Sequence, residues 1–336
     1  MADIIDNISI IGSGAWGTAL AEILARAGRK VTLYARDAGL ADKINRDHEN
    51  AAYLAGTKLD ERIRATADIA GAVKDAGFVL LVTPSQYLRE TLRKFAPHLP
   101  KNVPLVNGAK GIEMTTGYLL SEIAAEVVPS HPYAVLSGPT FASEAVRGLP
   151  TAVTLATTAG EAAGQLWAGS IRGKAFRPYV SGDVVGVEIA GALKNVIAIA
   201  CGIVEGKKLG QNAKAAVMTR GIAEIKRLGV RRGAKSETFL GLAGIGDLSL
   251  TCSSMTSRNY SLGVEFGQGK TLKQILAERH SVAEGVTTSW AVADYAEHHG
   301  VDMPICLAVK DILHNSANVD AIVAGLLSRD LKNEVV

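Results

Sequence analysis

A chain of 336 residues with 48% hydrophobic and 21% charged residues is long enough for two globular domains, each with its own core. Its formal charge of +3 at pH 7 is too small to indicate nucleic-acid binding, so any positive field is local and suited to a small anionic ligand. The longest apolar stretches contain Gly or charged residues within any window of about 20 positions, so the sequence supports no membrane span.

The first predicted elements are a strand, a glycine turn and a helix. An apolar run, Ile8–Ile11, leads into Gly12, Gly14 and Gly17, spaced GxGxxG, and a helical stretch and a second apolar run ending at Tyr34 follow. In this order Gly12 allows a tight turn, Gly14 the close approach of phosphates and Gly17 the packing of helix on strand. The segment predicts that a pyrophosphate binds at the helix N-terminus. The alternative is a structural turn of another α/β protein, since GxGxxG alone is a weak signal in a chain with 35 glycines.

The end of the second predicted strand bears on the choice of cofactor. Ala35 and Arg36 stand where an NAD-selective site usually has Asp or Glu, and Asp37 follows them. Because a guanidinium can hold a 2′-phosphate with two hydrogen bonds, Arg36 favours NADP(H). The alternative is that Arg36 is a solvated charge and Asp37 caps the next helix. Use of both NADP(H) and NAD(H) is compatible with either interpretation.

Up to about residue 180, short apolar runs alternate with helical patterns, which predicts a mostly parallel sheet with helices on both faces. The further candidate strands are 78–82, 103–106, 134–136, 152–155 and 175–179, with helices at 86–95, 118–127 and 161–168. Ligands of such sheets lie beyond the carboxyl ends of the strands. The segments after three strands, at Pro84, 108–111 and 137–140, are therefore candidate site loops.

From Asp183 onward the strand-like alternation fades and a second, all-helical domain is predicted, so that the domains cover 1–181 and 182–336. The predicted helices are 183–204, 211–229, 259–266, 271–278, 285–299 and 304–313. The first of them is apolar nearly all round and is expected to be buried. Lys194 lies in it, and a buried ammonium is costly unless it is paired or used. Such a lysine can exchange a proton with a reacting oxygen. The alternative is a lysine that reaches the surface.

A third cluster of candidate residues joins Gly244–Leu248 to a hydroxyl-rich stretch that ends in Ser257, Arg258 and Asn259. Small residues, hydroxyls and one guanidinium just before a helix can form an anion site from backbone amides and side-chain donors. The alternative is an ordinary helix N-cap followed by a surface arginine.

Taken together, these clusters resemble the bacterial-type NAD(P)-dependent glycerol-3-phosphate dehydrogenase family over essentially the whole chain. The matching segments are 12–17, 109–111, 137–142, 193–198, 246–248, 251–252, 257–259 and 282–285. The resemblance implies an α/β Rossmann-type N-terminal domain followed by an all-α C-terminal domain like that of 6-phosphogluconate dehydrogenase. It also implies reversible reduction of dihydroxyacetone phosphate to sn-glycerol 3-phosphate with NADPH or NADH, feeding glycerophospholipid synthesis.

The resemblance assigns roles to individual residues, with Lys194 as the proton donor or acceptor. The implied substrate contacts are Lys110, Gly138, Thr140, Lys194, Asn195, Asp247, Ser257, Arg258 and Asn259. The implied cofactor contacts are Gly12, Gly14, Ala15, Trp16, Gly17, Arg36, Lys110, Ala142, Arg258, Val282 and Glu284. One departure is Ala15, where many relatives have Ser, so a hydroxyl contact to the phosphates is lost while the backbone amide remains.

The remaining expectations concern compartment, metals and partners. Cys201, Cys252 and Cys306 form no CxxC pattern and the N-terminus is acidic, so we expect reduced thiols in a cytoplasmic protein without a signal peptide. No histidine spacing fits zinc, and no metal is expected. The expected partner is a small phosphorylated substrate, and the apolar helices are compatible with a homodimer. Two other functions stay open: a hydroxyacid or 6-phosphogluconate-type dehydrogenase, and a redox sensor that binds the nucleotide without turning it over.

Overall fold

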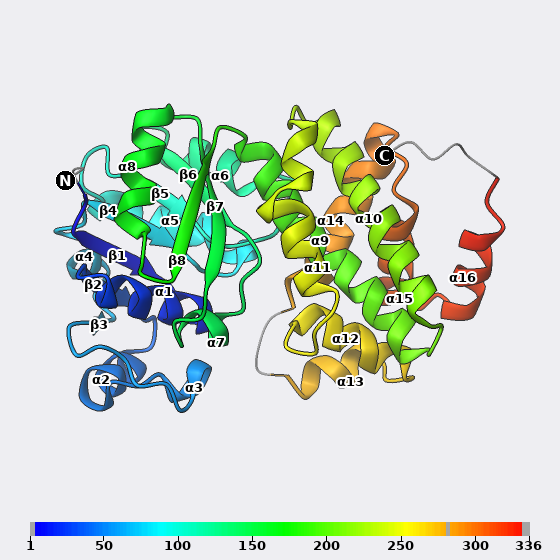
Figure 1. The fold of residues 1–336 in the computed structure, drawn as a ribbon, viewed down its shortest axis with the longest axis horizontal. Coiled ribbons are helices and arrows are strands. Elements are labelled where there is room, and N and C mark those ends of the chain that lie inside the picture. Colours follow the sequence, from blue (N-terminus) through cyan, green and yellow to red (C-terminus); the bar gives the residue numbers. More distant parts are fainter. Residues whose placement is uncertain (1–3, 280–282, 331–336) are drawn as a thin grey trace. The chain divides into compact units, whose positions relative to one another are not determined.

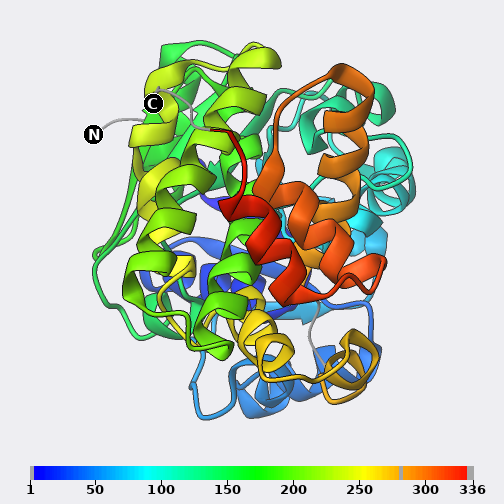
Figure 2. The ribbon, with the colours of Figure 1, turned by 90° about the vertical axis from the view of Figure 1, so that its right-hand side faces the viewer.

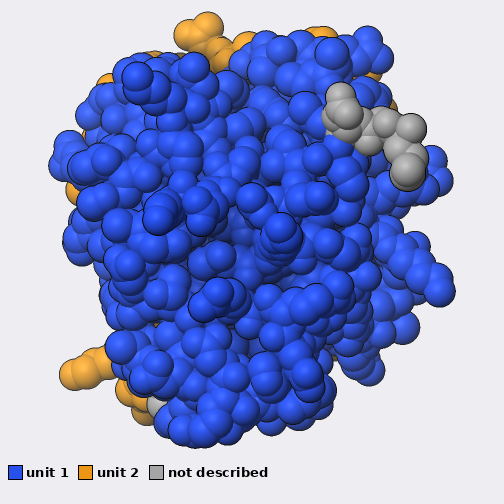
Figure 3. All heavy atoms as spheres, turned by 90° about the vertical axis from the view of Figure 1, so that its left-hand side faces the viewer, with its two compact units in different colours: residues 1–110, 119–187 blue, residues 111–118, 188–336 orange. Residues whose placement is uncertain are grey.

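A computed structural model describes residues 4–279 and 283–330. The chain divides into two compact units, the first formed by Met1–Lys110 and Leu119–Val187 and the second by Gly111–Tyr118 and Glu188–Val336. Figure 3 shows one face of unit 1 in blue. Each unit has its own architecture, and each carries a different part of the predicted chemistry.

Unit 1 contains an eight-stranded sheet with the order β3-β2-β1-β4-β5-β6-β7-β8 (Figure 1). The strands are β1 (Asn7–Ile11), β2 (Lys30–Tyr34), β3 (Arg64–Thr66), β4 (Phe78–Leu81), β5 (Leu105–Asn107), β6 (Tyr133–Ser137), β7 (Thr151–Thr157) and β8 (Phe176–Ser181). All neighbours pair in parallel except β6 and β7, which are antiparallel. The predicted mostly parallel Rossmann-type sheet is confirmed.

Helices cover both faces of this sheet. They are α1 (Ala15–Arg26), α2 (Ala38–Asp47), α3 (Ala51–Leu54), α4 (Ile69–Val73), α5 (Leu88–Phe95), α6 (Leu120–Val127), α7 (Ala142–Ala145) and α8 (Glu161–Ile171). Side chains alternate along a strand, so Ile10 of β1 joins one buried cluster and Ile11 the other. The first cluster includes Leu20 of α1 and Ile171 of α8, and the second includes Leu92 of α5.

Unit 2 is helical. Its helices are α9 (Val184–Gly206, beginning in unit 1), α10 (Gln211–Arg231), α11 (Asp247–Thr251), α12 (Arg258–Gly267), α13 (Leu272–Ala277), α14 (Glu284–His299), α15 (Pro304–His314) and α16 (Val319–Leu327). The orange α14 and α15 pack side by side (Figure 2). Among the described residues α9 is the one helix long and apolar enough to cross a membrane, but 94% of its apolar window is buried inside the protein. It is placed as the core helix of this unit.

The predicted division between residues 181 and 182 differs from the two compact units in two respects. Unit 1 continues to Val187, and Gly111–Tyr118 belongs to the helical unit. The segment Gly111–Tyr118 contains a hydrogen bond of its own, in which the N–H of Glu113 donates to the carbonyl of Tyr118 at 3.0 Å. The Arg232 guanidinium also donates to the carbonyl of Gly117 at 3.3 Å. The contact with Arg232 joins residues 115 positions apart and leaves no periodic signal in the sequence.

Several short elements have no counterpart among the predicted elements. The three-residue strand β3 pairs with Thr32–Tyr34 of β2, and α3, α4 and α7 have four or five residues each. Helix α16 at the end of the chain was also not predicted. The elements of three to five residues do not complete the two turns or the several alternations on which periodicity depends.

Candidate active site

The glycine turn of unit 1 is shaped by the space around its three glycines. Gly12 has φ +122°, and a Cβ there would lie 2.9 Å from the carbonyl oxygen of Val82. A Cβ on Gly17 would lie 1.9 Å from the carbonyl oxygen of Gly12, so α1 and the turn touch backbone to backbone. Around Gly14, by contrast, none of the described residues beyond its two chain neighbours lies within 4 Å of a Cβ position. The turn is therefore closed at two glycines and open at the third.

The N-terminus of α1 is suited to an anion. Gly14 is its N-cap and supplies no side chain to cap the helix, and the first turn contains no acidic residue. The first N–H groups of a helix have no partner within the helix, and the helix dipole is positive at this end. A dinucleotide pyrophosphate fits this geometry, since an uncapped N-terminus lies beside an open backbone position.

Ala15 and Trp16 are the first two residues of α1. The Trp16 ring packs 6.2 Å from the Phe176 ring, centroid to centroid, and its Nε1 lies 3.1 Å from a Cβ position on Gly108. The indole therefore helps to hold α1 against the sheet. What these two positions offer an anion is their backbone N–H groups.

At the end of β2, the neighbouring residues Arg36 and Asp37 have different roles. Asp37 caps α2, because its Oδ1 accepts a hydrogen bond from the N–H of Leu40 at 2.7 Å. This is the structural role that the sequence left open for Asp37. Arg36 is exposed and forms no hydrogen bond or ion pair with the residues that the structure describes. It is a cation that a ligand can use.

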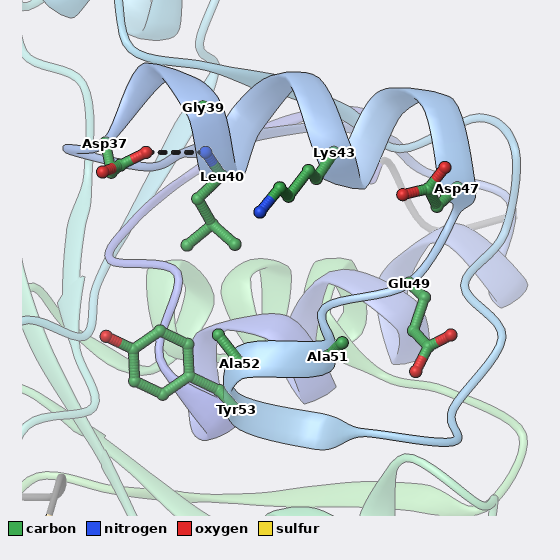
Figure 4. Close-up of a pocket in the computed structure, with 9 residues that line it drawn as sticks. All are labelled: Asp37, Gly39, Leu40, Lys43, Asp47, Glu49, Ala51, Ala52 and Tyr53. Atoms are coloured by element: carbon green, nitrogen blue, oxygen red, sulfur yellow. Dashed lines mark hydrogen bonds between the residues drawn. The ribbon is translucent and has the colours of Figure 1, made fainter.

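A pocket of about 580 Å³ lies between α2 and α3 (Figure 4). It is lined by Asp37, Gly39, Leu40, Lys43, Asp47, Glu49, Ala51, Ala52 and Tyr53. Lys43 extends from α2 into the space above Tyr53 of α3. None of the three motif glycines and no predicted site residue lines this pocket, so it is separate from the nucleotide turn.

The loops after β5 and β6 bring predicted substrate contacts together within unit 1. The Lys110 ammonium donates to the carbonyl of Gly138 at 3.3 Å, and the Thr140 hydroxyl donates to the same carbonyl at 3.1 Å. Gly138 has φ +154°, and a Cβ there would lie 2.9 Å from the Cα of Val153. Ala142, a predicted cofactor contact, begins α7 in the same loop region.

In unit 2, Lys194 is buried and paired. Its Nζ donates to Asp247 Oδ1 at 2.6 Å and to Thr251 Oγ1 at 2.7 Å, and the Thr251 hydroxyl donates to Asp247 Oδ1 at 3.2 Å. The exposed fractions are 7% for Lys194, 0% for Asp247 and 4% for Thr251. The alternative of a lysine reaching the surface is wrong. A buried ion pair with further hydrogen bonds keeps its charge in fixed geometry.

A break in the helix before α11 carries Asp247 to the lysine. A π-helical turn at Leu242–Gly246 contains Gly244, whose φ −90° and ψ −108° are not helical. A Cβ on Gly244 would lie 2.2 Å from the carbonyl oxygen of Phe239, so the close approach requires glycine. Asp247 and Thr251 then lie four residues apart on one face of α11. Such π-turns are frequent at functional sites.

The first turn of α12 is fixed on α9 and α14. Ser257 caps α12, since its Oγ accepts from the N–H of Tyr260 at 3.2 Å. Asn259 Oδ1 accepts from the N–H of Gly285 at 3.0 Å. A Cβ on Gly285 would lie 2.7 Å from the carbonyl oxygen of Asn195, the neighbour of the lysine. The N-cap alternative is correct for Ser257, and Asn195, Asn259 and Gly285 meet at one point.

Arg258 is the first residue of α12, and its side chain is exposed. Protein atoms still surround the guanidinium closely enough that desolvation lowers the pKa of Arg258, while the Glu284 carboxylate acts in the opposite direction. Arginine nevertheless stays protonated at neutral pH. The turn therefore combines a permanent cation, reachable by solvent, with the N-terminus of a ten-residue helix.

Glycines hold α12 against α9 at backbone distance. A Cβ on Gly202 of α9 would lie 2.1 Å from the carbonyl oxygen of Tyr260, and one on Gly206 would lie 2.3 Å from that of Val264. From the other side, a Cβ on Gly263 would lie 2.2 Å from the carbonyl oxygen of Ile199. The distance between the lysine helix and the arginine helix is thus set by main-chain contact.

Thr251 was not among the predicted site residues, although it contacts both Lys194 and Asp247; its spacing of four from Asp247 is the signal that could have identified it. Val282, a predicted cofactor contact, lies outside the described residues. Within the described ranges no group of three or more His, Cys, Asp or Glu could hold a metal ion.

Comparison with known proteins identifies the family. Residues 7–163 match the NAD-dependent glycerol-3-phosphate dehydrogenase N-terminus, and residues 183–324 match the C-terminus of the same family. The chain is 53% identical to a glycerol-3-phosphate dehydrogenase [NAD(P)+] of Rhodospirillum rubrum, over 99% of this chain and 95% of the relative. It is 52% identical to one of Caulobacter vibrioides, over 98% and 99%.

Among solved structures, glycerol-3-phosphate dehydrogenase from Coxiella burnetii is similar, with a TM-score of 0.92 and 37% identity. The match covers 97% of this chain and 99% of that one. The glycine turn, the buried lysine and the α12 turn therefore stand in a chain that belongs to the NAD-dependent glycerol-3-phosphate dehydrogenase family.

Proposed function

We propose that this chain is an oxidoreductase that reversibly reduces dihydroxyacetone phosphate to sn-glycerol 3-phosphate with NADPH or NADH. The observation that carries the proposal is the Lys194–Asp247–Thr251 cluster, in which a buried ammonium is held by a carboxylate at 2.6 Å and a hydroxyl at 2.7 Å. The relatives that share nearly the whole chain carry this activity in their names.

Ketone reduction places negative charge on the carbonyl oxygen as the carbon gains a hydride, which a bound nicotinamide nucleotide supplies. Lys194 stabilises this charge and donates a proton to the oxygen, and in the reverse direction it accepts the proton. Asp247 and Thr251 accept two of the three N–H groups of the ammonium and so fix its direction. Proton transfer requires this fixed direction, because the donor must lie within hydrogen-bond reach of the reacting oxygen.

The substrate phosphate is assigned to the first turn of α12. Arg258 supplies the cation, and the N–H groups at the start of α12 supply further donors, with Ser257 and Asn259 beside them. Asn195 belongs to this group through its contact with Gly285. From unit 1, Lys110, Gly138 and Thr140 are the proposed substrate contacts.

The nucleotide is assigned to the turn at Gly12, Gly14 and Gly17 and to the N–H groups of Ala15 and Trp16. Arg36 would hold a 2′-phosphate, which favours NADP(H) over NAD(H) without excluding either. Ala142, Lys110, Arg258, Val282 and Glu284 are the remaining proposed contacts. The product would serve glycerophospholipid synthesis in the cytoplasm, and a homodimer is compatible with this function.

The test is the initial rate of NADPH and NADH oxidation by the purified protein with dihydroxyacetone phosphate. We expect turnover with this ketone and none with β-ketoacid substrates of hydroxyacid dehydrogenases. Oxidation of NADPH or NADH with a β-ketoacid, or reduction of NADP+ or NAD+ with a hydroxyacid or 6-phosphogluconate, would instead assign the fold to another reaction. Tight nucleotide binding without a single turnover on any substrate would favour the redox-sensor alternative.

A further inference from the structure

We infer that Asn50 is a positioning residue that aims the nucleotide turn from outside the glycine motif; the inference rests on the proposed nucleotide site. Asn50 precedes α3 and is 0% exposed. Its Nδ2 donates to the carbonyl oxygen of Ser13 at 2.8 Å and to the Thr18 hydroxyl at 2.8 Å. Ser13 lies between the first two motif glycines, and Thr18 follows the third.

The Asn50 side chain does not serve its own helix. Asn is favoured at the N-cap because its side-chain oxygen can accept from the first helical N–H groups. Asn50 occupies the N-cap of α3, yet its side chain makes no cap hydrogen bond there. The side chain instead crosses 37 positions of sequence to reach Ser13. Capping therefore does not account for this residue.

The contact with Ser13 determines the direction of a backbone donor. In a planar trans peptide the carbonyl of one residue and the N–H of the next point in opposite directions. Holding the Ser13 carbonyl toward Asn50 consequently turns the Gly14 N–H toward the opposite side. That N–H has no acceptor among the described residues, and beyond the two chain neighbours no described residue has an atom within 4 Å of a Cβ position on Gly14. The donor points where an anion can approach.

Two donors converge on this one carbonyl. The Thr18 hydroxyl also donates to the Ser13 oxygen, at 3.3 Å, so Asn50, Thr18 and Ser13 form a closed set of hydrogen bonds. The Oδ1 atom of Asn50 is buried and has no hydrogen-bond partner in the described structure. Buried polar atoms without partners are rare and call for a specific reason. Fixing the phosphate turn supplies that reason, because the amide must present its nitrogen to a carbonyl, which only accepts.

The chain offers a matched control in Asn45 of α2. Asn45, like Asn50, makes two side-chain hydrogen bonds of 2.8 Å, but it is exposed and both of its bonds are to the backbone of Ala65 in β3. The experiment measures the dissociation constant of NADPH by fluorescence titration for the unsubstituted protein, Asn50→Ala and Asn45→Ala, together with the melting temperature of each. We expect Asn50→Ala to weaken NADPH binding about tenfold, the effect of losing the one hydrogen bond that a correctly directed Gly14 N–H would make with the nucleotide. Asn45→Ala should lower the melting temperature and leave the dissociation constant near that of the unsubstituted protein.

Two more variants keep the test decisive. Asn50→Leu fills the buried space without donors, so it should reproduce the loss of affinity even where Asn50→Ala fails to fold. Thr18→Val retains the Asn50–Ser13 hydrogen bond, so it should weaken NADPH binding less than either Asn50 variant does. Equal NADPH affinity in folded Asn50 variants and the unsubstituted protein would overturn the inference, as would equal losses in the Asn45 and Asn50 variants. If the unsubstituted protein binds neither nucleotide, the proposed function is what fails, and the inference falls with it.

Discussion

The two candidate binding regions are built from different parts of the polypeptide. In unit 1 the nucleotide turn is formed by the backbone. Gly12 and Gly17 have no room for a side chain, and the hydrogen-bond donors are N–H groups. In unit 2 the lysine cluster is formed by side chains. Lys194 donates to Asp247 and Thr251, which lie 53 and 57 positions further along the sequence. Substitutions should therefore separate the two regions, with loss of nucleotide affinity in one and loss of turnover in the other.

The sharpest test of this separation is Lys194→Ala. Because the lysine is the proposed proton donor, we expect kcat to fall about 100-fold or more, as for the loss of a positioned acid or base. The nucleotide dissociation constant should stay unchanged. Lys207→Ala is the matched control, since Lys207 directly follows α9 and pairs with Asp320 at the surface. Near-normal kcat in a folded Lys194→Ala protein would remove the lysine from the mechanism.

Arg258→Ala should affect the substrate rather than the chemical step. Loss of a hydrogen-bonded cation is expected to raise KM for dihydroxyacetone phosphate roughly 10- to 100-fold. Lys270→Ala serves as the control, because Lys270 is a cation of unit 2 that pairs with Glu265 and Glu278. Steady-state kinetics at varied substrate concentration gives KM for both variants. An unchanged KM for Arg258→Ala would place the phosphate elsewhere.

Thr251→Val tests whether the hydroxyl directs the lysine. The substitution keeps the shape of the side chain and removes an acceptor at 2.7 Å from Nζ. We expect kcat to fall about tenfold, in line with one hydrogen bond to a charged group. Thr251→Ser keeps the hydroxyl and should recover most of the rate. Equal rates for the Val and Ser variants would show that Asp247 alone orients the amine.

Arg36→Ala tests the nucleotide region in isolation. Since the side chain is exposed, its interaction with a 2′-phosphate is expected to be modest. The affinity for NADPH should fall about fivefold, while the affinity for NADH should change little. Competition titrations with the two nucleotides measure the ratio. Equal losses for both would refute the role in 2′-phosphate selection.

The two units also differ in how pH should act on their stability. Burial raises the pKa of Glu224 to about 7 in unit 2, although its carboxylate accepts from the N–H groups of Ile305 and Cys306 at 2.7 and 3.1 Å. In unit 1, the Arg62 side chain lowers the pKa of Asp60 to about 2. The Asp60 contribution is lost only as pH falls below about 4, so a window near pH 6 reports on Glu224.

In that window the folded protein holds a proton on Glu224 that the unfolded chain has released. The contribution of Glu224 is therefore full below its unfolded pKa of 4.5 and is lost as pH rises through about 7. We expect the free energy of unfolding to fall by about 1 kcal/mol between pH 5.5 and 6.5. Urea titrations at both values measure the change, and Glu224→Gln should remove it. A slope that persists in the Gln variant would assign the pH dependence to another group.

Sequence reasoning reached the nucleotide turn and the buried helix because both are local patterns. GxGxxG lies within six residues, and an apolar surface all round a helix indicates burial whatever its neighbours are. The same reasoning did not reach Thr251 or Asn50, whose partners are distant in the chain. Sequence reasoning also could not show that Gly111–Tyr118 belongs to the helical unit. A hydroxyl or an amide has the same appearance in the sequence whether it faces solvent or a buried partner.

The main-chain contact between α9 and α12 has a consequence for altering the substrate. Gly202 and Gly206 leave no room for even a methyl group against Tyr260 and Val264, so the two helices cannot be moved closer, and larger residues would break the packing. The span from the amine on one helix to the guanidinium on the other is thus fixed by the skeleton of the protein. An engineer who wishes to admit a longer phosphorylated ketone therefore has to change side chains around the site and leave the spacing of the two helices as it is.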